Sequence, residues 1–501
     1  MSKKFWIESI SPKISKKLWI PSESHKGPPL HNSEHHEQFL HFWDHTSSSR
    51  AAKYFNTNDW EPAVLPTDRI IARKIRVYPN HQQKRVFKRL FDAHRFFYNK
   101  AVEILNKHFD GLKKKFITQN NCAFCKKLKS LNNSFTCSKH ADKKINWTKG
   151  INASYLRKCI IPKHLTKKTL WQQEIPYDTK DLAIKDAITA YKSCTTNLNN
   201  GNIKDFTMWF KSRKNPRQIF WIDNRAINTE NKKLRIFPTR IKKPIYVRKR
   251  QRNKLPPMTQ TTDGQKCIKH DAKFLYDRGA YYFVFTINEE ATEAIKPKYS
   301  IVSLDPGVRT FQTCYSPSGI AFKTSNKQQY ILKSLNAKLE ELRSERDKST
   351  NPVQYRRRRK KCLKIERKKS NIAENIRNQL ATYLTKNYGT IVIPKFSTSQ
   401  LQQNPDLSSI TKKTMTDMSH YKFRMKLADL CKRDGRDLQI VEEHYTSQTC
   451  GKCGAINKIG KDVVYKCNKC SYEMDRDMNG ARNILLKTLT EAKVKENKET
   501  D

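Results

Sequence analysis

Two closely spaced cysteine pairs constrain the fold of this chain more than any other feature of its sequence. Cys450 and Cys453 form one Cys-x-x-Cys pair, and Cys467 and Cys470 form a second after a gap of 13 residues. Four thiolates in two such pairs can surround one Zn²⁺ tetrahedrally, at about 2.3 Å per bond. A closed set of four cysteines leaves no position for a substrate, so the pattern predicts a structural zinc ribbon folded by its metal.

A second group of metal-type residues has a similar spacing. Cys122 and Cys125 are followed, after a gap of 11 residues, by Cys137 and His140. Three thiolates and an imidazole also suit zinc, which predicts a zinc knuckle inserted among helices. The alternative is that small buried thiols and an exposed histidine share this spacing by coincidence.

The charge of the chain indicates its partner. The 501 residues include 100 Lys and Arg against 47 Asp and Glu, a formal net charge of +53. A compact protein with this much unneutralised charge repels itself, so a polyanion is the natural partner. Binding of nucleic acid would be strongly salt-dependent, because each neutralised phosphate releases counterions. On composition alone, a ribosomal-type or chromatin-like basic protein is the alternative.

Hydrophobicity indicates a globular chain rather than a basic tail. Hydrophobic residues make up 37% of the sequence, enough to build cores in two or three domains. No run of about 18 apolar residues occurs, and the opening MSKKFWIESISPKISKKLWIP lacks the apolar centre of a signal peptide. We therefore expect no membrane association, and a reducing compartment in which the cysteines are thiols and metal ligands.

Periodicity divides the chain into regions of different texture. Residues 1–65 read as an irregular extension, and IIARKIRVYPN, at 70–80, reads as a strand that ends at the proline. Residues 81–205 are mainly helical in pattern, and residues 206–298 contain short alternating runs typical of a small β-domain. From residue 299 onward, strands and long helices alternate, which is typical of an α/β nuclease-like core.

Acidic residues are sparse in this chain, which makes their positions informative. IVSLDPGVRTF, at 301–311, is an apolar strand that ends at Asp305. A carboxylate on a buried strand costs on the order of several kcal/mol unless a cation or donors meet it, so a metal ligand competes here with a solvated turn aspartate. In DRDMNGARNILLK, at 475–487, Asp475 or Asp477 begins a helix, and an ordinary acidic N-cap is the alternative to a ligand.

These motifs, in this order, resemble the TnpB family of transposon-encoded RNA-guided nucleases, ancestors of type V CRISPR effectors. The resemblance covers residues 68–487. It is carried by Asp-Pro-Gly at the end of a strand, a long basic helical pair, Tyr-Thr-Ser-Gln-Thr-Cys-x-x-Cys-Gly, a second Cys-x-x-Cys and Arg-Asp-x-Asn-Gly-Ala-Arg-Asn-Ile. Residues 76–99 and FKSRKNPRQIFWI, at 210–222, are similar to the family's recognition-lobe helix and wedge domain.

The resemblance implies a multidomain α+β fold. A wedge β-barrel would carry an inserted helical recognition domain, and an RNase H-like (RuvC) α/β nuclease domain would carry the inserted four-cysteine zinc ribbon. The implied divisions are an N-terminal extension at 1–65, a wedge domain at 66–80 and 206–298, a helical recognition domain at 81–205 with its zinc knuckle at 122–140, a RuvC domain at 299–447 and 475–490, a zinc ribbon at 448–474, and a C-terminal tail at 491–501.

The resemblance also implies phosphodiester hydrolysis by two Mg²⁺ ions held by three carboxylates. Asp305 matches the first acidic motif of the family, and Asp477, in Arg-Asp-x-Asn, matches the third, with Asp475 as the alternative. The second motif departs from the pattern. Ile393 is followed by Pro394 where the family has its glutamate, and proline binds no metal.

In the eukaryotic and giant-virus branch of the family, called Fanzor, a glutamate shortly before Tyr-Thr-Ser takes that place. This chain has Glu442 and Glu443 there, within LQIVEEHY, at 438–445, a predicted fifth strand. The first, fourth and fifth strands of an RNase H-like sheet are neighbours, so a glutamate ending the fifth can reach metals held by the first. Successive residues on a strand face opposite ways. We therefore predict Glu443 as the ligand and a surface or basic-partner role for Glu442.

Two basic runs and some aromatic residues remain. The run at 354–370 is either a solvated face or a nucleic-acid contact, and its position between the first two acidic motifs favours contact with guide RNA and target. YVRKRQRNK, at 246–254, is either an RNA-binding loop or a nuclear-import signal. The aromatic residues at 96–98 and in FTMWF, at 206–210, are interpreted as core rather than as base-stacking platforms.

The predicted function is that of an RNA-guided DNA endonuclease encoded by a transposon. A guide (omega) RNA would pair with one strand of double-stranded DNA beside a short motif read by the protein. The alternatives are a nuclease-dead RNA-guided DNA-binding regulator, suggested by Pro394, and a DNA transposase of the same fold. Expected cofactors are Mg²⁺, Zn²⁺ and the guide RNA. We expect a monomer in the nucleus of a eukaryotic host, by the likeness to Fanzor, or otherwise in the nucleoid or cytoplasm.

Overall fold

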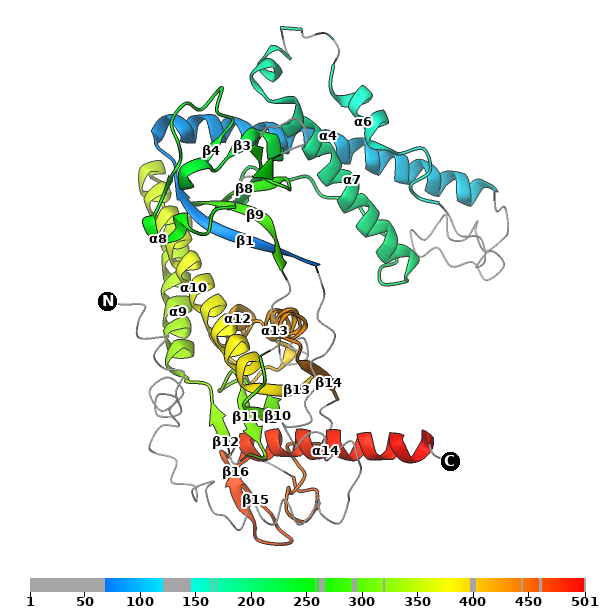
Figure 1. Ribbon diagram of the computed structural model, residues 1–501, viewed down its shortest axis with the longest axis vertical. Helices are drawn as coiled ribbons and strands as arrows, with labels where there is room; N and C mark the ends of the chain where they lie inside the picture. The colour runs from blue at the N-terminus through cyan, green and yellow to red at the C-terminus, as the bar shows by residue number, and fades with distance from the viewer. Residues whose placement is uncertain are drawn as a thin grey trace. The chain divides into compact units, whose positions relative to one another are not determined.

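The computed structural model shows a multidomain α+β protein, as predicted, with two compact units (Figure 1). The N-terminal unit is Ile70–Glu289, and the C-terminal unit comprises the described residues of Glu290–Asp501 with Asp68 and Arg69. The structure describes residues 68–119, 146–162, 164, 166–167, 169–256, 259–260, 266–290, 295–318, 320–396, 402–442, 445–458 and 462–499. The predicted N-terminal extension, the knuckle residues Cys122, Cys125, Cys137 and His140, and Glu443 lie outside them.

The N-terminal unit contains a five-stranded sheet in the order β2-β8-β9-β1-β5. Its strands are β1 (Asp68–Tyr78), β2 (Arg217–Ile222), β5 (Tyr246–Val247), β8 (Ala272–Asp277) and β9 (Ala280–Glu290). Two short hairpins accompany it, β3 (Ile227–Asn228) with β4 (Arg235–Ile236) and β6 (Thr259–Gln260) with β7 (Lys266–Cys267). Within the described part of the chain, β2 and β5 are the sheet's two edges, so the closed barrel that was predicted is not confirmed.

The helices of this unit begin directly after β1, where the sequence predicted a strand followed by a helix. They are α4 (His81–Gln119), α6 (Ala153–Ile160), α7 (Tyr177–Asn199) and α8 (Lys249–Arg252), with short 3₁₀ turns at Leu170–Glu174, Asn224–Ala226 and Glu230–Lys232. Asn80 and Gln83 form a reciprocal cap, because each side-chain oxygen accepts a bond of 2.9 Å from the other's backbone N–H. This cap fixes the start of α4, which packs beside α7 (Figure 1).

The C-terminal unit contains a second five-stranded sheet, in the order β12-β11-β10-β13-β14. Its strands are β10 (Tyr299–Asp305), β11 (Thr313–Ser316), β12 (Ile320–Lys323), β13 (Tyr388–Pro394) and β14 (Asp437–Val441). β10, β11 and β12 are antiparallel neighbours, whereas β13 runs parallel to both β10 and β14. The predicted neighbourhood of the first, fourth and fifth strands of this sheet is therefore observed.

Helices cover both faces of this sheet. They are α9 (Lys327–Asp347), α10 (Pro352–Asn387), α12 (Ser409–Met418), α13 (His420–Asp434) and α14 (Arg476–Glu499). Alternate residues of β10 enter different cores: Val302 packs with residues of α10 and α13, whereas Ile301 packs with α14. Because side chains alternate along a strand, Ser303 and Asp305 share the α14 face with Ile301.

The remaining strands belong to the segment that contains the four cysteines. β15 (Val464–Lys466) pairs antiparallel with β16 (Glu473–Asp475), which leads directly into α14.

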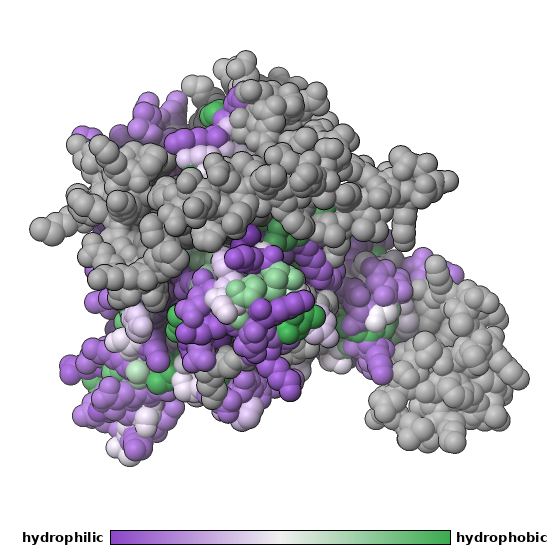
Figure 2. All heavy atoms as spheres, turned by 90° about the horizontal axis from the view of Figure 1, so that it is seen from below, coloured by the Kyte–Doolittle hydropathy of each residue, from purple (hydrophilic) through white to green (hydrophobic). Residues whose placement is uncertain are grey.

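On the face seen in Figure 2, the described residues in view are mostly hydrophilic, with smaller hydrophobic patches. No described helix is both long and apolar enough to cross a membrane.

Candidate nuclease and metal sites

Asp305 lies at the end of β10 against the first turns of α14. Two residues earlier on the same face of the strand, the Ser303 hydroxyl donates a 2.7 Å hydrogen bond to the carbonyl oxygen of Ala481. This bond holds the strand to the helix. A Cβ added at Gly480 would lie 2.7 Å from Oδ2 of Asp305. A side chain at this position would therefore collide with the carboxylate, and glycine lets the strand end and the helix approach closely.

Asp475 and Asp477 have different surroundings at the start of α14. The Asp475 carboxylate accepts hydrogen bonds from the backbone N–H groups of Asp477, at 3.0 Å, and Met478, at 3.1 Å. It therefore satisfies amides that a helix end leaves without partners. Asp477 belongs to the helix itself, three residues before Gly480. Residues three apart share a helix face, so Asp477 and Gly480 both lie on the face toward Asp305.

Lys323 completes this cluster, and sequence reasoning missed it. Asp305 pairs with Thr313 across β10 and β11, and Thr313 pairs with Lys323 across β11 and β12, so the three residues form one row across the sheet. The Lys323 ammonium lies 2.7 Å from a carboxylate oxygen of Asp475 and 3.0 Å from Oδ2 of Asp477. An ammonium bridging two carboxylates indicates a site that suits a cation, and carboxylate oxygens are the ligands that Mg²⁺ prefers.

A cleft of about 880 Å³ opens beside these residues. Lys323 and Asp477 line it together with four other basic side chains, Arg309, Lys327, Lys368 and Arg476. Cationic side chains around a carboxylate cluster suit a phosphodiester, because they bind phosphate oxygens while the carboxylates hold a metal.

The basic run at 354–370 lies on α10, and most of its side chains are exposed. Two of its members have structural roles: Arg358 pairs with Glu345 of α9 at 3.2 Å, and the buried Lys369 pairs with Asp417 at 2.9 Å. The other basic residues of the run leave a largely solvent-facing cationic surface along the helix.

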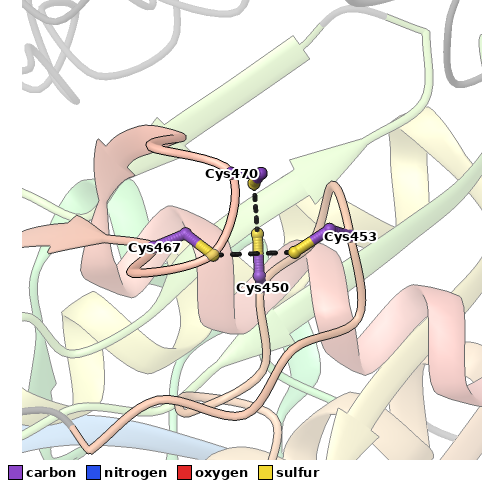
Figure 3. Close-up of side chains that lie close together, drawn as sticks. All are labelled: Cys450, Cys453, Cys467 and Cys470. Atoms are coloured by element: carbon purple, nitrogen blue, oxygen red, sulfur yellow. Dashed lines mark hydrogen bonds between the residues drawn. The ribbon is translucent and has the colours of Figure 1, made fainter.

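The four cysteines predicted as zinc ligands converge (Figure 3). The Sγ atoms of Cys450 and Cys470 are 3.7 Å apart, those of Cys453 and Cys467 are 3.6 Å apart, and all four lie within 4.8 Å of one another. Zinc–sulfur bonds of about 2.3 Å give a tetrahedron with edges of about 3.8 Å, so the spacing fits a metal. Among the described residues, this is the group of His, Cys, Asp and Glu side chains arranged to hold an ion.

Backbone amides favour the thiolate form of Cys467, whereas burial raises the pKa of the Cys450 and Cys470 thiols. The N–H of Lys452 donates to Sγ of Cys450, and the N–H of Lys469 donates to Sγ of Cys467, each at 3.4 Å. Burial alone would raise the pKa of the Cys467 thiol, but amides of Cys470 and Lys469 and the adjacent thiols outweigh it and lower that pKa to about 6. A thiolate is the form that binds zinc.

The two candidate glutamates follow the end of β14. Val441 pairs with Pro394 at the end of β13 and packs against the core beneath α14. Glu442 is half-exposed and pairs with Lys395 at 2.7 Å, and Glu443 is outside the described residues.

The aromatic segments correct part of the sequence interpretation. Phe97 and Tyr98 are buried, as predicted. Phe96 is 39% exposed, Trp209 is 89% exposed and Phe210 is 59% exposed, so the prediction that these three belong to the core is wrong. For Trp209 and Phe210 the reason lies in α4: Asn106 exchanges two 3.0 Å hydrogen bonds with the backbone of Met208, and Asn99 similarly holds Lys211. These bonds fix the backbone from Met208 to Lys211, and in this stretch only the Met208 side chain is buried.

Comparison with known proteins shows which proteins this chain resembles. Residues 420–484 match the family model described as Cas12f1-like, TNB domain, and residues 69–110 match a helix-turn-helix domain model. The chain is 28% identical to a putative transposase of Paramecium bursaria Chlorella virus 1, over 87% of this chain and 90% of that protein. It is 24% identical to a TnpB-like protein of Acanthamoeba polyphaga mimivirus, over 83% of this chain and 73% of that one. The relatives that align over most of this chain include TnpB-like proteins.

Other similarities are either shorter or lower in sequence identity. It is 27% identical, over 41% of its length and 54% of the other, to the putative RNA-guided DNA endonuclease InsQ of Escherichia coli K12. A solved Cas12f1-sgRNA-target DNA complex aligns with a TM-score of 0.46 and 13% identity, over 84% of this chain and 99% of that one. The segment 420–484, which matches the Cas12f1-like model, contains the four cysteines and Asp477.

Proposed function

We propose that this protein is a TnpB-family RNA-guided DNA endonuclease of transposon origin. The observation that carries the proposal is that Asp305, at the end of β10, faces Gly480 in the first turns of α14, where Lys323 pairs with Asp475 and Asp477. Asp477 lines a cleft together with several basic side chains. A relative named as a putative RNA-guided DNA endonuclease supports it. The charge of +53 supports both a guide RNA and a double-stranded DNA target as partners.

Asp305 and Asp477 are the residues we assign to hold Mg²⁺. Bound there, the metal would supply an activated water and would stabilise the leaving oxygen of the phosphodiester. Lys323 balances the charge of the cluster in the metal-free chain, and Asp475 serves as the cap that orients the first turn of α14. The basic side chains of the cleft bind and orient the phosphate backbone.

Glu443 is the third carboxylate in this proposal. Val441 packs on the α14 side of the sheet, and alternation along a strand returns to the same side two residues later. The intervening Glu442 has a partner of its own in Lys395. These two observations support Glu443 as the ligand and Glu442 as a surface residue.

The finer architecture is part of the same proposal. The C-terminal unit is an RNase H-like (RuvC) domain with an inserted four-cysteine zinc ribbon, and the N-terminal unit combines a wedge domain with a helical recognition domain that carries a second zinc at Cys122, Cys125, Cys137 and His140. The domain divisions given above, the Fanzor branch and a nuclear location follow from the sequence resemblance, and the giant-virus relatives support the branch.

Cleavage of DNA by the chain loaded with its copurified RNA tests the proposal. With Mg²⁺, we expect cutting of matched DNA by the natural protein, none by Asp305→Asn or Asp477→Asn, and retained target binding by both variants. Lys395→Met, which removes an exposed pair away from the cleft, is the control and should cut. Binding without cutting by the natural protein would indicate a regulator, and unguided strand transfer would indicate a transposase; either result contradicts the proposal.

A further inference from the structure

Two asparagines of α14 bind the backbone around the first cysteine pair. The Nδ2 group of Asn479 donates to the carbonyl oxygen of Thr449 at 2.8 Å, and the N–H of Gly451 donates to Oδ1 of Asn479 at 3.2 Å. Thr449 and Gly451 are the residues on either side of Cys450. One side chain of α14 therefore holds both peptide groups that flank a predicted zinc ligand.

Asn483, one turn further along α14, extends this attachment. Its Nδ2 group donates to the carbonyl oxygens of Thr446, at 2.8 Å, and Thr449, at 2.7 Å. Asn479 is fully buried and Asn483 is 5% exposed, so water cannot replace these bonds easily. A Cβ on Gly451 would lie 3.0 Å from Oδ1 of Asn483, which shows how closely the loop lies on the helix.

The second cysteine pair is also attached to the same stretch of α14. Nη1 of Arg482 donates to the hydroxyl of Tyr472 at 3.2 Å, and Tyr472 packs against the cysteine cluster beside Cys470. In Figure 3 a helix passes behind the four thiols. The segment from Asn479 to Asn483 thus contacts both halves of the cysteine site and begins two residues after Asp477.

We propose that Asn479 and Asn483 are positioning residues that couple the four-cysteine site to the carboxylate cluster. The expected effect on Mn²⁺ binding rests on the proposed nuclease function, whereas the hydrogen bonds of the two asparagines do not. A metal on the four thiols fixes Cys450, and the buried amide bonds on either side of it then fix the first turns of α14 against β10. Asp477 and Gly480 lie in those turns, so the geometry of the Asp305 cluster depends on the state of the cysteines.

The coupling has a chemical consequence. Loss of the zinc would free the peptide groups of Thr449 and Gly451 and would leave the buried amides of α14 without their partners. The helix start then loses its fixed position, and the carboxylates lose their spacing. Weakening of divalent-metal binding at the carboxylate cluster should follow even though no cysteine touches that metal.

The experiment uses the full chain and compares four variants with the natural protein: Cys450→Ser, Asn479→Asp, Asn483→Ala and, as a matched control, Asn387→Ala. Asn387 donates one 2.7 Å bond to the carbonyl oxygen of Tyr383 in its own helix, far along the chain from either site. Asn479→Asp keeps the acceptor for Gly451 and removes the donor to Thr449. Each protein is examined for zinc content, for Mn²⁺ affinity by electron paramagnetic resonance, and for amide hydrogen exchange in residues 476–485.

We expect Cys450→Ser to lower zinc by about one per chain and Mn²⁺ affinity by about 10- to 100-fold, the range found when outer residues of metal sites are changed. Asn479→Asp and Asn483→Ala should keep the zinc, lower Mn²⁺ affinity by about 10-fold or more, and speed exchange in residues 476–485. Asn387→Ala should resemble the natural protein in all three measurements.

Two results would overturn the coupling. In the first, the asparagine variants keep their zinc and have the Mn²⁺ affinity and hydrogen exchange of the natural protein. In the second, the variants lose their zinc together with their Mn²⁺ affinity. Either result would show that these residues do not couple the two sites. Asp477→Asn should abolish the Mn²⁺ binding of the natural protein. If the natural protein bound no Mn²⁺, or if the variant bound it equally well, the proposed nuclease site would be wrong instead. The exchange of residues 476–485 with and without zinc would still decide whether the asparagines transmit the metal state.

Discussion

Replacing Lys323 by methionine tests the carboxylate cluster most directly. The substitution removes the ammonium, which lies 2.7 Å and 3.0 Å from oxygens of Asp475 and Asp477, and keeps most of the side-chain volume. Two unit charges about 3 Å apart attract by roughly 1.4 kcal/mol in bulk water. Lys323→Met loses two such pairs and leaves the carboxylates of Asp475 and Asp477 to repel each other. We therefore expect its unfolding free energy without metal to fall by about 1–3 kcal/mol.

The same substitution should have the opposite effect on metal binding. A divalent ion that enters the cluster must displace the Lys323 ammonium or sit beside it, and removal of one competing interaction of about 1.4 kcal/mol corresponds to a tenfold change in affinity. We therefore expect Lys323→Met to bind Mn²⁺ about tenfold more tightly. Saturating Mg²⁺ should also restore most of the stability lost in EDTA.

Thermal unfolding in EDTA and in Mg²⁺, with Mn²⁺ titration by electron paramagnetic resonance, measures both effects. For a unit of this size, about 1–3 kcal/mol corresponds to a fall of roughly 2–12 °C in Tm in EDTA. Lys395→Met is the matched control, because its pair with Glu442 is exposed and should contribute less than about 1 kcal/mol in either buffer. Equal destabilisation of Lys323→Met with and without metal, or weaker Mn²⁺ binding, would refute the reasoning.

Four further predictions concern other parts of the molecule. The purified chain should hold about two zinc ions, and Cys137→Ser should lower this by about one; a single zinc in the natural protein would contradict the knuckle. Glu443→Ala should abolish guided cleavage and Glu442→Ala should cut, and exchanged outcomes would reverse the assignment. Neutralising the arginines at 356–359 should flatten the salt dependence of RNA binding, whereas an unchanged slope would make the run a solvated face. Burial lowers the pKa of His420 to about 4 from 6.5, so the unfolded chain binds a proton there that the folded chain does not as pH falls. Unfolding free energy measured in urea should therefore drop by about 2 kcal/mol from pH 7 to pH 5, and His420→Gln should show less of this drop.

Much of the fold and part of the site were predictable because their signals are local. The two cysteine pairs have the spacing of zinc knuckles, and the four thiols do converge. The strand that ends at Asp305 is apolar at three of its four buried positions, and the residues after Pro79 repeat apolar side chains at helical spacing and form α4. Each of these signals lies within a window of about 20 residues, where backbone periodicity and ligand spacing limit the possible structures.

Contacts between distant segments were not predictable in this way. Lys323 joins the carboxylates only because two antiparallel pairings bring it into one row with Asp305, and no local pattern reveals that register. Trp209 belongs to an aromatic run that reads as core, yet asparagines of α4 hold its backbone so that its side chain faces solvent.

The sequence by itself indicated the candidate site residues of this protein: the cysteine pairs, Asp305, and an aspartate at the start of the last helix. Only the tertiary structure showed how the two aspartates differ in their surroundings: Asp475 caps α14, and Asp477 lies on the helix face near Gly480. Only the tertiary structure, too, brought Asn479 to the backbone beside Cys450. The physical reason is that residue type and local period decide what a side chain can do, whereas packing of segments far apart in the chain decides which groups it meets.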